Sequence, residues 1–189
     1  MLNQAQAGQR QVYFVDAAHF VYGAFLTVVW GFKRIFIKTP AGRQRLNVLG
    51  AINAISRQFV SVINHAYINA QRVCDLFDKL RELHPAAPLT IVLDNARYQH
   101  CRKVLAHAAQ RGITLMFLPP YSPNLNLIER LWKFIKKDCL NGRYYPTHQD
   151  FQAAILESLN AINTRHKAAL TRTLTLNFQM FDNVQILAA

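Results

Sequence analysis

The sequence predicts an α/β fold in which a mixed sheet of five strands is flanked by helices. Short runs rich in β-branched and aromatic residues are grouped in the first third of the chain. From residue 69 onward, segments with apolar residues at helical spacing alternate with short apolar runs. No repeat or Gly/Ser linker divides the 189 residues. We therefore expect a single domain with its own hydrophobic core.

The first part of the chain predicts a meander of strands. The strands are expected at 12–17, once or twice within 24–38, at 46–53 and at 59–64, with a turn at 39–42 and a hairpin at 53–57. Residues 1–11 are polar and read as an N-terminal tail. This part should supply the antiparallel half of the sheet.

The second part predicts alternating helices and strands. Helices are expected at 69–83, at about 98–111, from about 124 and at 151–162, with strands at 89–94 and 113–118. Gly112 is expected to cap the second helix, and Pro119, Pro120 and Pro123 stiffen the turn before the third. Residues 174–181 are interpreted as an edge strand or as a segment that docks on the body or on a partner.

Charge favours a polyanionic partner. The chain has 22 Lys and Arg against 10 Asp and Glu, a formal net charge of +12. A globular domain this basic most often handles nucleic acid, and the alternative is a basic protein with no particular partner. Because 51% of the residues are hydrophobic, disorder is excluded as the main state.

The cysteines and the N-terminus predict a cytoplasmic protein. The three cysteines are odd in number and not spaced as zinc ligands, so they are expected to be reduced thiols. The polar segment 1–11 is not a signal peptide. The apolar stretch 12–30 is nearly long enough to cross a membrane, but Asp16, His19 and Gly23 interrupt it, so we interpret it as strands.

Three acids stand at the ends of predicted elements. Asp16 and Asp94 each close a buried strand, and the carboxyl ends of strands are where open α/β sheets keep their sites. Glu129 lies in the first turns of the helix that follows the proline-rich turn. The alternative for Glu129 is a surface ion pair with Lys133, four residues later.

Segments 12–20, 92–96 and 118–132 together closely resemble the catalytic domain of bacterial insertion-sequence transposases of the mariner-like DDE superfamily (the insertion sequence 630 family). The third segment, Leu-Pro-Pro-Tyr-Ser-Pro-Asn-Leu-Asn-Leu-Ile-Glu-Arg-Leu-Trp, is the most specific. The 34 residues between Asp94 and Glu129 match the family spacing, while Leu127 stands where the family usually has proline. The resemblance covers about 12–165 and leaves 166–189 as a C-terminal extension.

The resemblance implies a ribonuclease-H-like fold and a DNA-cleaving site. Asp16, Asp94 and Glu129 would hold two Mg²⁺ ions, with Mn²⁺ as a substitute. Asp16 would bridge both ions, with Asp94 on one and Glu129 on the other. The implied reaction is nicking at transposon ends, followed by attack of the freed 3′-hydroxyl on target DNA, with DNA and a second copy of the chain as partners. Mg²⁺ and Mn²⁺ prefer carboxylate oxygens as ligands. No Cys or His cluster lies beside the acids, which favours Mg²⁺ over zinc.

Other polar residues near the three motifs are candidates for DNA contacts or for supporting the acids. They are His19, Asn95, His100, Tyr121, Asn124, Asn126, Lys133, Lys136 and Lys137, with Arg97, Arg102, Lys103 and Arg143 as further basic residues. Each has a plainer alternative: turn chemistry for Asn95, surface histidines, helix capping for Asn124 and Asn126, packing for Tyr121, and a solvated helix face for the basic residues.

Two other functions remain open at this point. One is a ribonuclease-H-like nuclease that hydrolyses DNA or a hybrid without joining strands, and the other is a non-catalytic DNA-binding remnant of a transposase. Family members usually carry helix-turn-helix domains ahead of the first acid, and only a short segment precedes Asp16 here. We therefore expect a separate helix-turn-helix polypeptide, or a split, truncated or partial chain, and nonspecific, salt-sensitive DNA binding.

Overall fold

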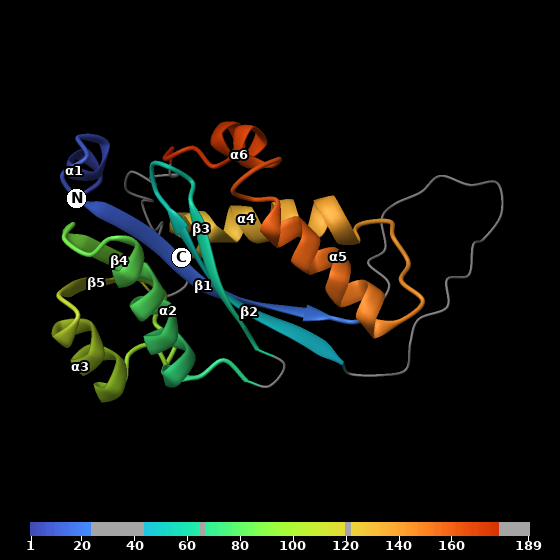
Figure 1. The fold of residues 1–189 in the computed structure, drawn as a ribbon, viewed down its shortest axis with the longest axis horizontal. Helices are drawn as coiled ribbons and strands as arrows, with labels where there is room; N and C mark the ends of the chain where they lie inside the picture. Colours follow the sequence, from blue (N-terminus) through green and yellow to red (C-terminus); the bar gives the residue numbers. More distant parts are fainter. Residues whose placement is uncertain (24–43, 65–66, 120–121, 178–189) are drawn as a thin grey trace, which may run out of the picture.

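Five strands form one mixed sheet at the centre of the molecule (Figure 1). The computed structural model describes residues 1–23, 44–64, 67–119 and 122–177. The strands are β1 (Gln11–Val21), β2 (Arg45–Asn53), β3 (Phe59–Asn64), β4 (Leu89–Leu93) and β5 (Ile113–Phe117), in the spatial order β3-β2-β1-β4-β5. β1, β2 and β3 pair antiparallel, while β1, β4 and β5 pair parallel. The predicted mixed five-stranded sheet is confirmed; the strands and turn expected within 24–42 lie outside the described residues.

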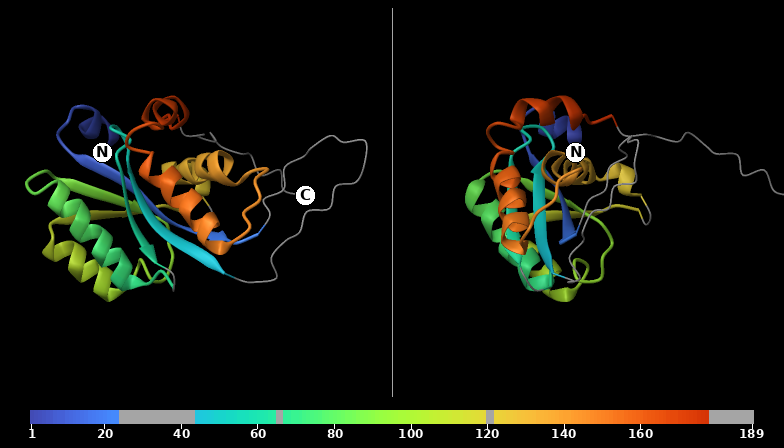
Figure 2. Two further views of the ribbon diagram at one scale, coloured as in Figure 1. Left: turned by 45° about the vertical axis from the view of Figure 1, so that its right-hand side comes forward. Right: turned by 90° about the vertical axis from the view of Figure 1, so that its right-hand side faces the viewer.

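Helices cover both faces of the sheet (Figure 2). One face packs on α2 (Ala70–Leu83) and α3 (Arg102–Gln110), and the other on α4 (Leu127–Ile135) and α5 (His148–Asn160). Because side chains alternate along a strand, β1 contributes to two cores. Its Tyr13 and Val15 pack on the α2 side, whereas Phe14 and Phe20 pack on the α4 side.

The first strand is longer than its sequence indicates. β1 runs to Val21, where it pairs with Arg45 at the start of β2, instead of ending at 17. The polar residues Asp16 and His19 weaken the apolar pattern, but pairing with β2 supplies a backbone partner along this whole stretch. His19 consequently lies within the strand and not in a loop after it.

The turns follow local side-chain chemistry. In the β2–β3 hairpin, Asn53 Oδ1 accepts from the backbone N–H groups of Ile55 and Ser56 at 2.8 and 2.9 Å. Arg57 completes this turn with φ of 59°, so the predicted hairpin is confirmed. After α3, Gly112 has φ of 60°, the left-handed conformation of the predicted helix cap.

Helix boundaries differ from the prediction by a few residues. α3 begins at Arg102, because residues 94–101 form turns after β4. α5 begins at His148 and is capped by Thr147, whose Oγ1 accepts from the Asp150 N–H at 3.1 Å. The proline-rich turn forms the 3₁₀ helix η1 (Pro123–Leu125) before α4, and α4 continues into the π-helix η2 (Lys136–Leu140).

The two ends of the described chain hold helices that the pattern did not show. The polar N-terminal segment forms α1 (Leu2–Gln6), whose Ala5 is buried, and α6 (Lys167–Thr173) lies across the α4 side. Residues 174–177 form no strand, and 178–181 lie outside the described residues. In the described part of the chain, no helix is both long and apolar enough to cross a membrane.

Candidate active site

The sheet brings Asp16 and Asp94 next to each other. In the parallel β1–β4 pair, Phe14 is opposite Val92, and the same register places position 16 opposite position 94, just past the end of β4. Phe14 and Val92 both pack in the core on the α4 side. Because side chains two residues apart share a face, both acids lie at the carboxyl edge of β4 on the α4 side.

Helix α4 brings Glu129 to the same edge. The helix buries Ile128, Leu131 and Ile135 against the sheet, which fixes its rotation. One turn after Glu129, the indole N–H of Trp132 donates a hydrogen bond to Asp16 Oδ2 at 3.0 Å. Residues three apart lie on neighbouring parts of a helix surface, so Glu129 faces the site of Asp16.

The three carboxylates interact electrostatically. Burial, together with the charges of Glu129 and Asp94, raises the pKa of Asp16 to about 7, against the opposing hydrogen bonds from the Ala17 backbone and from Trp132. None of the described ion pairs involves Asp16 or joins Glu129 to Lys133. The buried negative charge of Asp16 thus stands beside two more acids and has no cationic partner among the described residues.

Trp132 is a site residue that was not among the candidates predicted from the sequence. Its ring lies edge-on to Phe20 and Phe59, with centroids at 6.2 and 6.1 Å. Gly50, the partner of Asp16 on β2, leaves room for it, because a Cβ there would lie 2.6 Å from Trp132 Cη2. A glycine inside an apolar strand is the signal of such a close approach, and it could have pointed to this contact.

Asn126 joins α4 to β1. It occupies the N-cap position of α4, yet its side chain caps no backbone N–H; instead its Nδ2 donates to the Val15 carbonyl at 3.3 Å. Asn126 is 4% exposed, and its Oδ1 has no hydrogen-bond partner. The predicted capping role therefore gives way to a contact beside Asp16. Asn124 lies exposed in η1.

The turn after β4 holds the second acid. Asp94 Oδ1 accepts from the Ala96 N–H at 3.2 Å, and Asn95 Nδ2 donates to the Leu118 carbonyl at 2.7 Å. Asn95 therefore ties the ends of β4 and β5 together, in the manner of turn chemistry. Burial, together with the charges of Asp94 and Asp16, raises the pKa of Tyr98 to about 12. Tyr98, which the sequence pattern did not single out, thus lies close to both acids.

Two predicted histidines lie away from the acids or contact other groups. His19 is an odd number of residues from Asp16 along β1, so it points to the opposite face, where its Nδ1 lies 2.6 Å from Asn47 Oδ1. The exposed His100 packs edge-on to Phe117 at 4.5 Å. Tyr121 lies outside the described residues.

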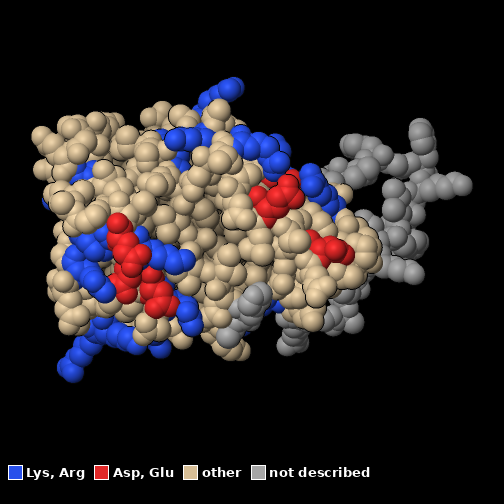
Figure 3. All heavy atoms as spheres, in the orientation of Figure 1, with Lys and Arg blue, Asp and Glu red and all other residues tan. Residues whose placement is uncertain are grey.

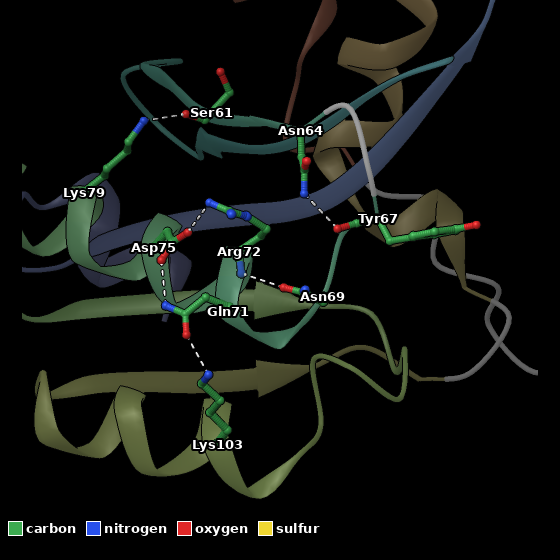
Figure 4. A network of polar contacts seen from close by, with 9 residues as sticks. All are labelled: Ser61, Asn64, Tyr67, Asn69, Gln71, Arg72, Asp75, Lys79 and Lys103. Carbon is green, nitrogen blue, oxygen red and sulfur yellow. Dashed lines mark hydrogen bonds and ion pairs between the residues drawn. The ribbon is translucent and has the colours of Figure 1, made fainter. Parts of the chain in front are cut away.

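Four of the predicted basic residues, all lysines, lie in two places. Lys133 and Lys137 line a cavity on α4, and Lys136 begins η2 beside them. Lys103 instead donates to Gln71 Oε1 at 2.6 Å and so ties α3 to α2 (Figure 4). Figure 3 shows Lys and Arg atoms gathered along the upper edge of the molecule, over α6, and around a group of acids over α2.

The donor set fits a hard divalent cation. Within the described residues no group of three or more His, Cys, Asp or Glu side chains converges closely enough to hold a metal ion. The residues at this edge nevertheless offer oxygen donors, three carboxylates and the unpartnered Asn126 Oδ1, of the kind that Mg²⁺ and Mn²⁺ prefer. A cation here would offset the uncompensated charge around Asp16.

Known proteins are similar to this chain in sequence or in fold. An uncharacterized protein of Sinorhizobium fredii (strain NBRC 101917 / NGR234), y4pE/y4sA, is 34% identical over 70 residues, 37% of this chain and 50% of that protein. The Mos1 strand transfer complex matches with a TM-score of 0.59 and 11% identity, over 94% of this chain and 59% of that chain.

Two further solved structures share the fold. The mariner Mos1 paired end complex with Mg has a TM-score of 0.59 and 10% identity, over 96% of this chain and 60% of that chain. The catalytic core domain of BIV integrase has a TM-score of 0.52 and 15% identity, over 82% of this chain and 84% of that chain. The chain spans between half and three-fifths of the Sinorhizobium protein and of Mos1. The observed architecture is therefore the predicted ribonuclease-H-like fold of transposase and integrase catalytic cores.

The family is shown by a direct sequence match. The model of the DDE superfamily endonuclease family matches residues 11–152, a range that includes Asp16, Asp94 and Glu129. This range covers β1 to the first turns of α5, the elements that build the site. The chain belongs to the DDE superfamily of endonucleases.

Proposed function

We propose that this chain is the catalytic core of an insertion-sequence transposase of the insertion sequence 630 type, which cleaves DNA at transposon ends and joins the freed 3′-hydroxyl to target DNA. The observation that supports the proposal is that Asp16, hydrogen-bonded to Trp132, interacts electrostatically with both Asp94 and Glu129. Similar Mos1 structures include a strand transfer complex and a paired end complex with Mg.

The three carboxylates would hold Mg²⁺. Two such ions supply Lewis-acid stabilisation of the attacking and leaving oxygens in displacements at phosphorus. The protein contributes the positions of the ligands: the Trp132 N–H holds Asp16 Oδ2, and the Ala96 N–H holds Asp94 Oδ1. Glu129 is carried on a helix fixed by its buried face. Nicking and strand joining are both in-line displacements at phosphorus, so one site serves both.

A strand-transfer assay tests this proposal. The chain is incubated with Mg²⁺, a pre-cleaved transposon end with a free 3′-hydroxyl, and a supercoiled target plasmid. A transposase core gives joined products as well as nicks, and Asp94→Asn gives neither. Nicks without joined products would support the ribonuclease-H-like nuclease, and the absence of both would support the DNA-binding remnant.

The rest of the machinery is proposed to come from partners. We infer that the chain acts as a homodimer and that a separate helix-turn-helix polypeptide supplies recognition of the ends. The net charge of +12 favours DNA through the phosphate backbone, which carries no sequence information. We expect this chain alone to bind end and random duplexes with equal affinity, falling steeply with salt; a strong preference for one sequence would contradict this division of tasks.

A further inference from the structure

A cavity of about 650 Å³ opens between α4 and α6, outside the group of three acids. Its lining residues are Arg130, Lys133, Phe134, Lys137, Asp138 and Thr173. The first four lie along α4 and its continuation η2 at spacings of one, three or four residues, so they form one continuous stripe of the helix surface. Arg130 directly follows Glu129, so the cavity begins within one turn of the proposed active site.

The charges in this cavity are of two kinds. Arg130 and Asp138 are committed to the protein: the guanidinium donates to the carbonyls of Thr175 and Asn177 at 2.8 and 3.0 Å, and Asp138 Oδ2 accepts from Ser158 Oγ at 2.7 Å. The exposed ammonium groups of Lys133 and Lys137, by contrast, have no hydrogen bond or ion pair within the described part of the chain. Two available cations, about 6 Å apart along the helix axis, thus face the cavity.

Phe134 gives the cavity an aromatic wall. The ring is partly buried and is held edge-on by His166, with centroids at 5.2 Å. An aromatic wall with cations beside it is suited to an occupant that has both a flat face and negative charge. The volume lies within the range of small-molecule sites and admits one nucleotide, whereas a duplex is too wide.

We propose that this cavity binds one nucleotide of an unpaired DNA strand, with its base on the Phe134 ring and its phosphates on Lys133 and Lys137. This inference rests on the proposed function, because the cavity begins beside the acids that would cut that DNA. The cavity would be a subsite for a DNA strand that is unpaired next to the point of cleavage. The site would read the presence of a base and not its identity, since stacking tolerates every base.

Binding without metal tests this subsite separately from cleavage. In EDTA, the affinity of the chain is measured by fluorescence anisotropy for a short single-stranded oligonucleotide and for the same strand with abasic sites. We expect the strand with bases to bind about tenfold more tightly. Phe134→Leu, which keeps an apolar side chain in the wall, should remove most of this difference and leave the affinity for the abasic strand unchanged.

The lysines give an independent readout. Lys133→Gln combined with Lys137→Gln should weaken binding of both strands and lower the slope of log affinity against log salt by at least about 0.7. The matched control is Lys79→Gln on the opposite face of the sheet, combined with Arg10→Gln to remove the same charge. This control should lose less affinity for both strands than the lysine variant does.

Three results would overturn the subsite: equal affinity for the two strands in the wild type, equal losses in the lysine and control variants, or competition by a free deoxynucleoside monophosphate as strong as by the oligonucleotide. Lys133 and Lys137 are exposed, so their substitution should not disturb folding. The lysine variant therefore still tests the subsite if Phe134→Leu does not fold. Nicking in Mg²⁺ is scored separately. Failure of the subsite leaves nicking intact, whereas failure of the proposed function removes nicking and leaves base preference unaffected.

Discussion

The two faces of the sheet differ in whether a buried or half-buried acid has a cationic partner. On the α2 side, Asp78 lies 2.7 Å from Arg111 and 2.8 Å from His107, so its charge is compensated by groups on the neighbouring helix. On the α4 side, Asp16 is bonded to a neutral indole and faces two further carboxylates, and its pKa is raised to about 7. Both acids stand among packed elements, but only one has the partners that stability requires.

This difference identifies the α4 side as the place where an acid lowers the stability of the fold. A carboxylate buried without a cation destabilises the folded state, and perturbed acids of this kind cluster at functional sites. The α2 side carries its charges in surface pairs and behaves as an ordinary supporting layer. The α4 side combines the acids, the close approach of Trp132 to Gly50 and the cavity with two available lysines.

The largest expected effect comes from neutralising an acid on each face. Asp94→Asn should abolish Mg²⁺-dependent nicking of a supercoiled plasmid while leaving the fold intact, because it removes a ligand and keeps the shape of the side chain. Asp78→Asn is the matched control and should keep full nicking activity, with a loss of unfolding free energy below about 1 kcal/mol. If Asp94→Asn still nicked the plasmid, the acid on the α4 side would be no more important for activity than the acid on the α2 side.

The next effect is on stability and its pH dependence. Because the pKa of Asp16 is raised from 3.8 to about 7, folding favours the protonated acid. The unfolding free energy of the wild type, relative to that of Asp16→Asn, is therefore highest below about pH 4, falls as the pH rises toward 7, and is constant above pH 7.

Urea unfolding at several pH values measures this effect. Above pH 7, Asp16→Asn should be more stable than the wild type by as much as about 4 kcal/mol, one pKa unit being worth about 1.4 kcal/mol. The two curves should meet near pH 4. A constant difference between pH 4 and pH 8 would show that Asp16 is not held in an unfavourable charged state.

A smaller effect is expected on activity when the hydrogen bond to Asp16 is removed. Trp132→Phe should lower nicking about 10- to 100-fold, the range typical of residues that orient a metal ligand, and should raise the Mg²⁺ concentration needed for half-maximal rate. Phe20→Leu is the control, since Phe20 packs on the same ring without touching Asp16 through a hydrogen bond. It should reduce stability but leave the Mg²⁺ requirement unchanged. If both variants raised the Mg²⁺ requirement equally, Trp132 would contribute through packing and not through its hydrogen bond.

The smallest effect concerns the space for the indole. Gly50→Ala should lower the free energy of unfolding by about 1 to 3 kcal/mol, because the new Cβ meets Trp132 Cη2 at 2.6 Å and Phe59 Cε2 at 2.8 Å. Gly23→Ala has nothing within 4 Å of the new Cβ and should change stability by less than about 0.5 kcal/mol. If the two substitutions were equally mild, Trp132 would not be packed tightly against β2.

The sequence predicted well what depends on local pattern. Apolar alternation located the described strands, the Asn53 turn and the Gly112 cap, because each depends on residues within a few positions. Family resemblance named three acids, and the register of the β1–β4 pair, which ends at Phe14 and Val92, runs toward Asp16 and Asp94. The length of β1 was underestimated because its support comes from β2, nearly thirty residues away in the chain.

The sequence could not predict contacts between distant segments. The bond from Trp132 to Asp16 spans 116 positions, and that from Asn126 to the Val15 carbonyl spans 111. The position of His19 followed from strand length: once β1 continues past 17, alternation sends this side chain to the other face. The cavity depends on α6, a short helix whose sequence shows no strong period.

Asp16, Asp94 and Glu129 are proposed to bind divalent cations together, and crystals soaked in Mn²⁺ would reveal such ions by the anomalous signal of the metal. We predict density at the carboxyl edge of β4, with carboxylate oxygens of all three residues at about 2.0 to 2.3 Å. Asp94→Asn crystals should lose at least one of the ions. Metal density at another position, or carboxylates that stay apart in saturating Mn²⁺, would show that the three acids do not form a metal site.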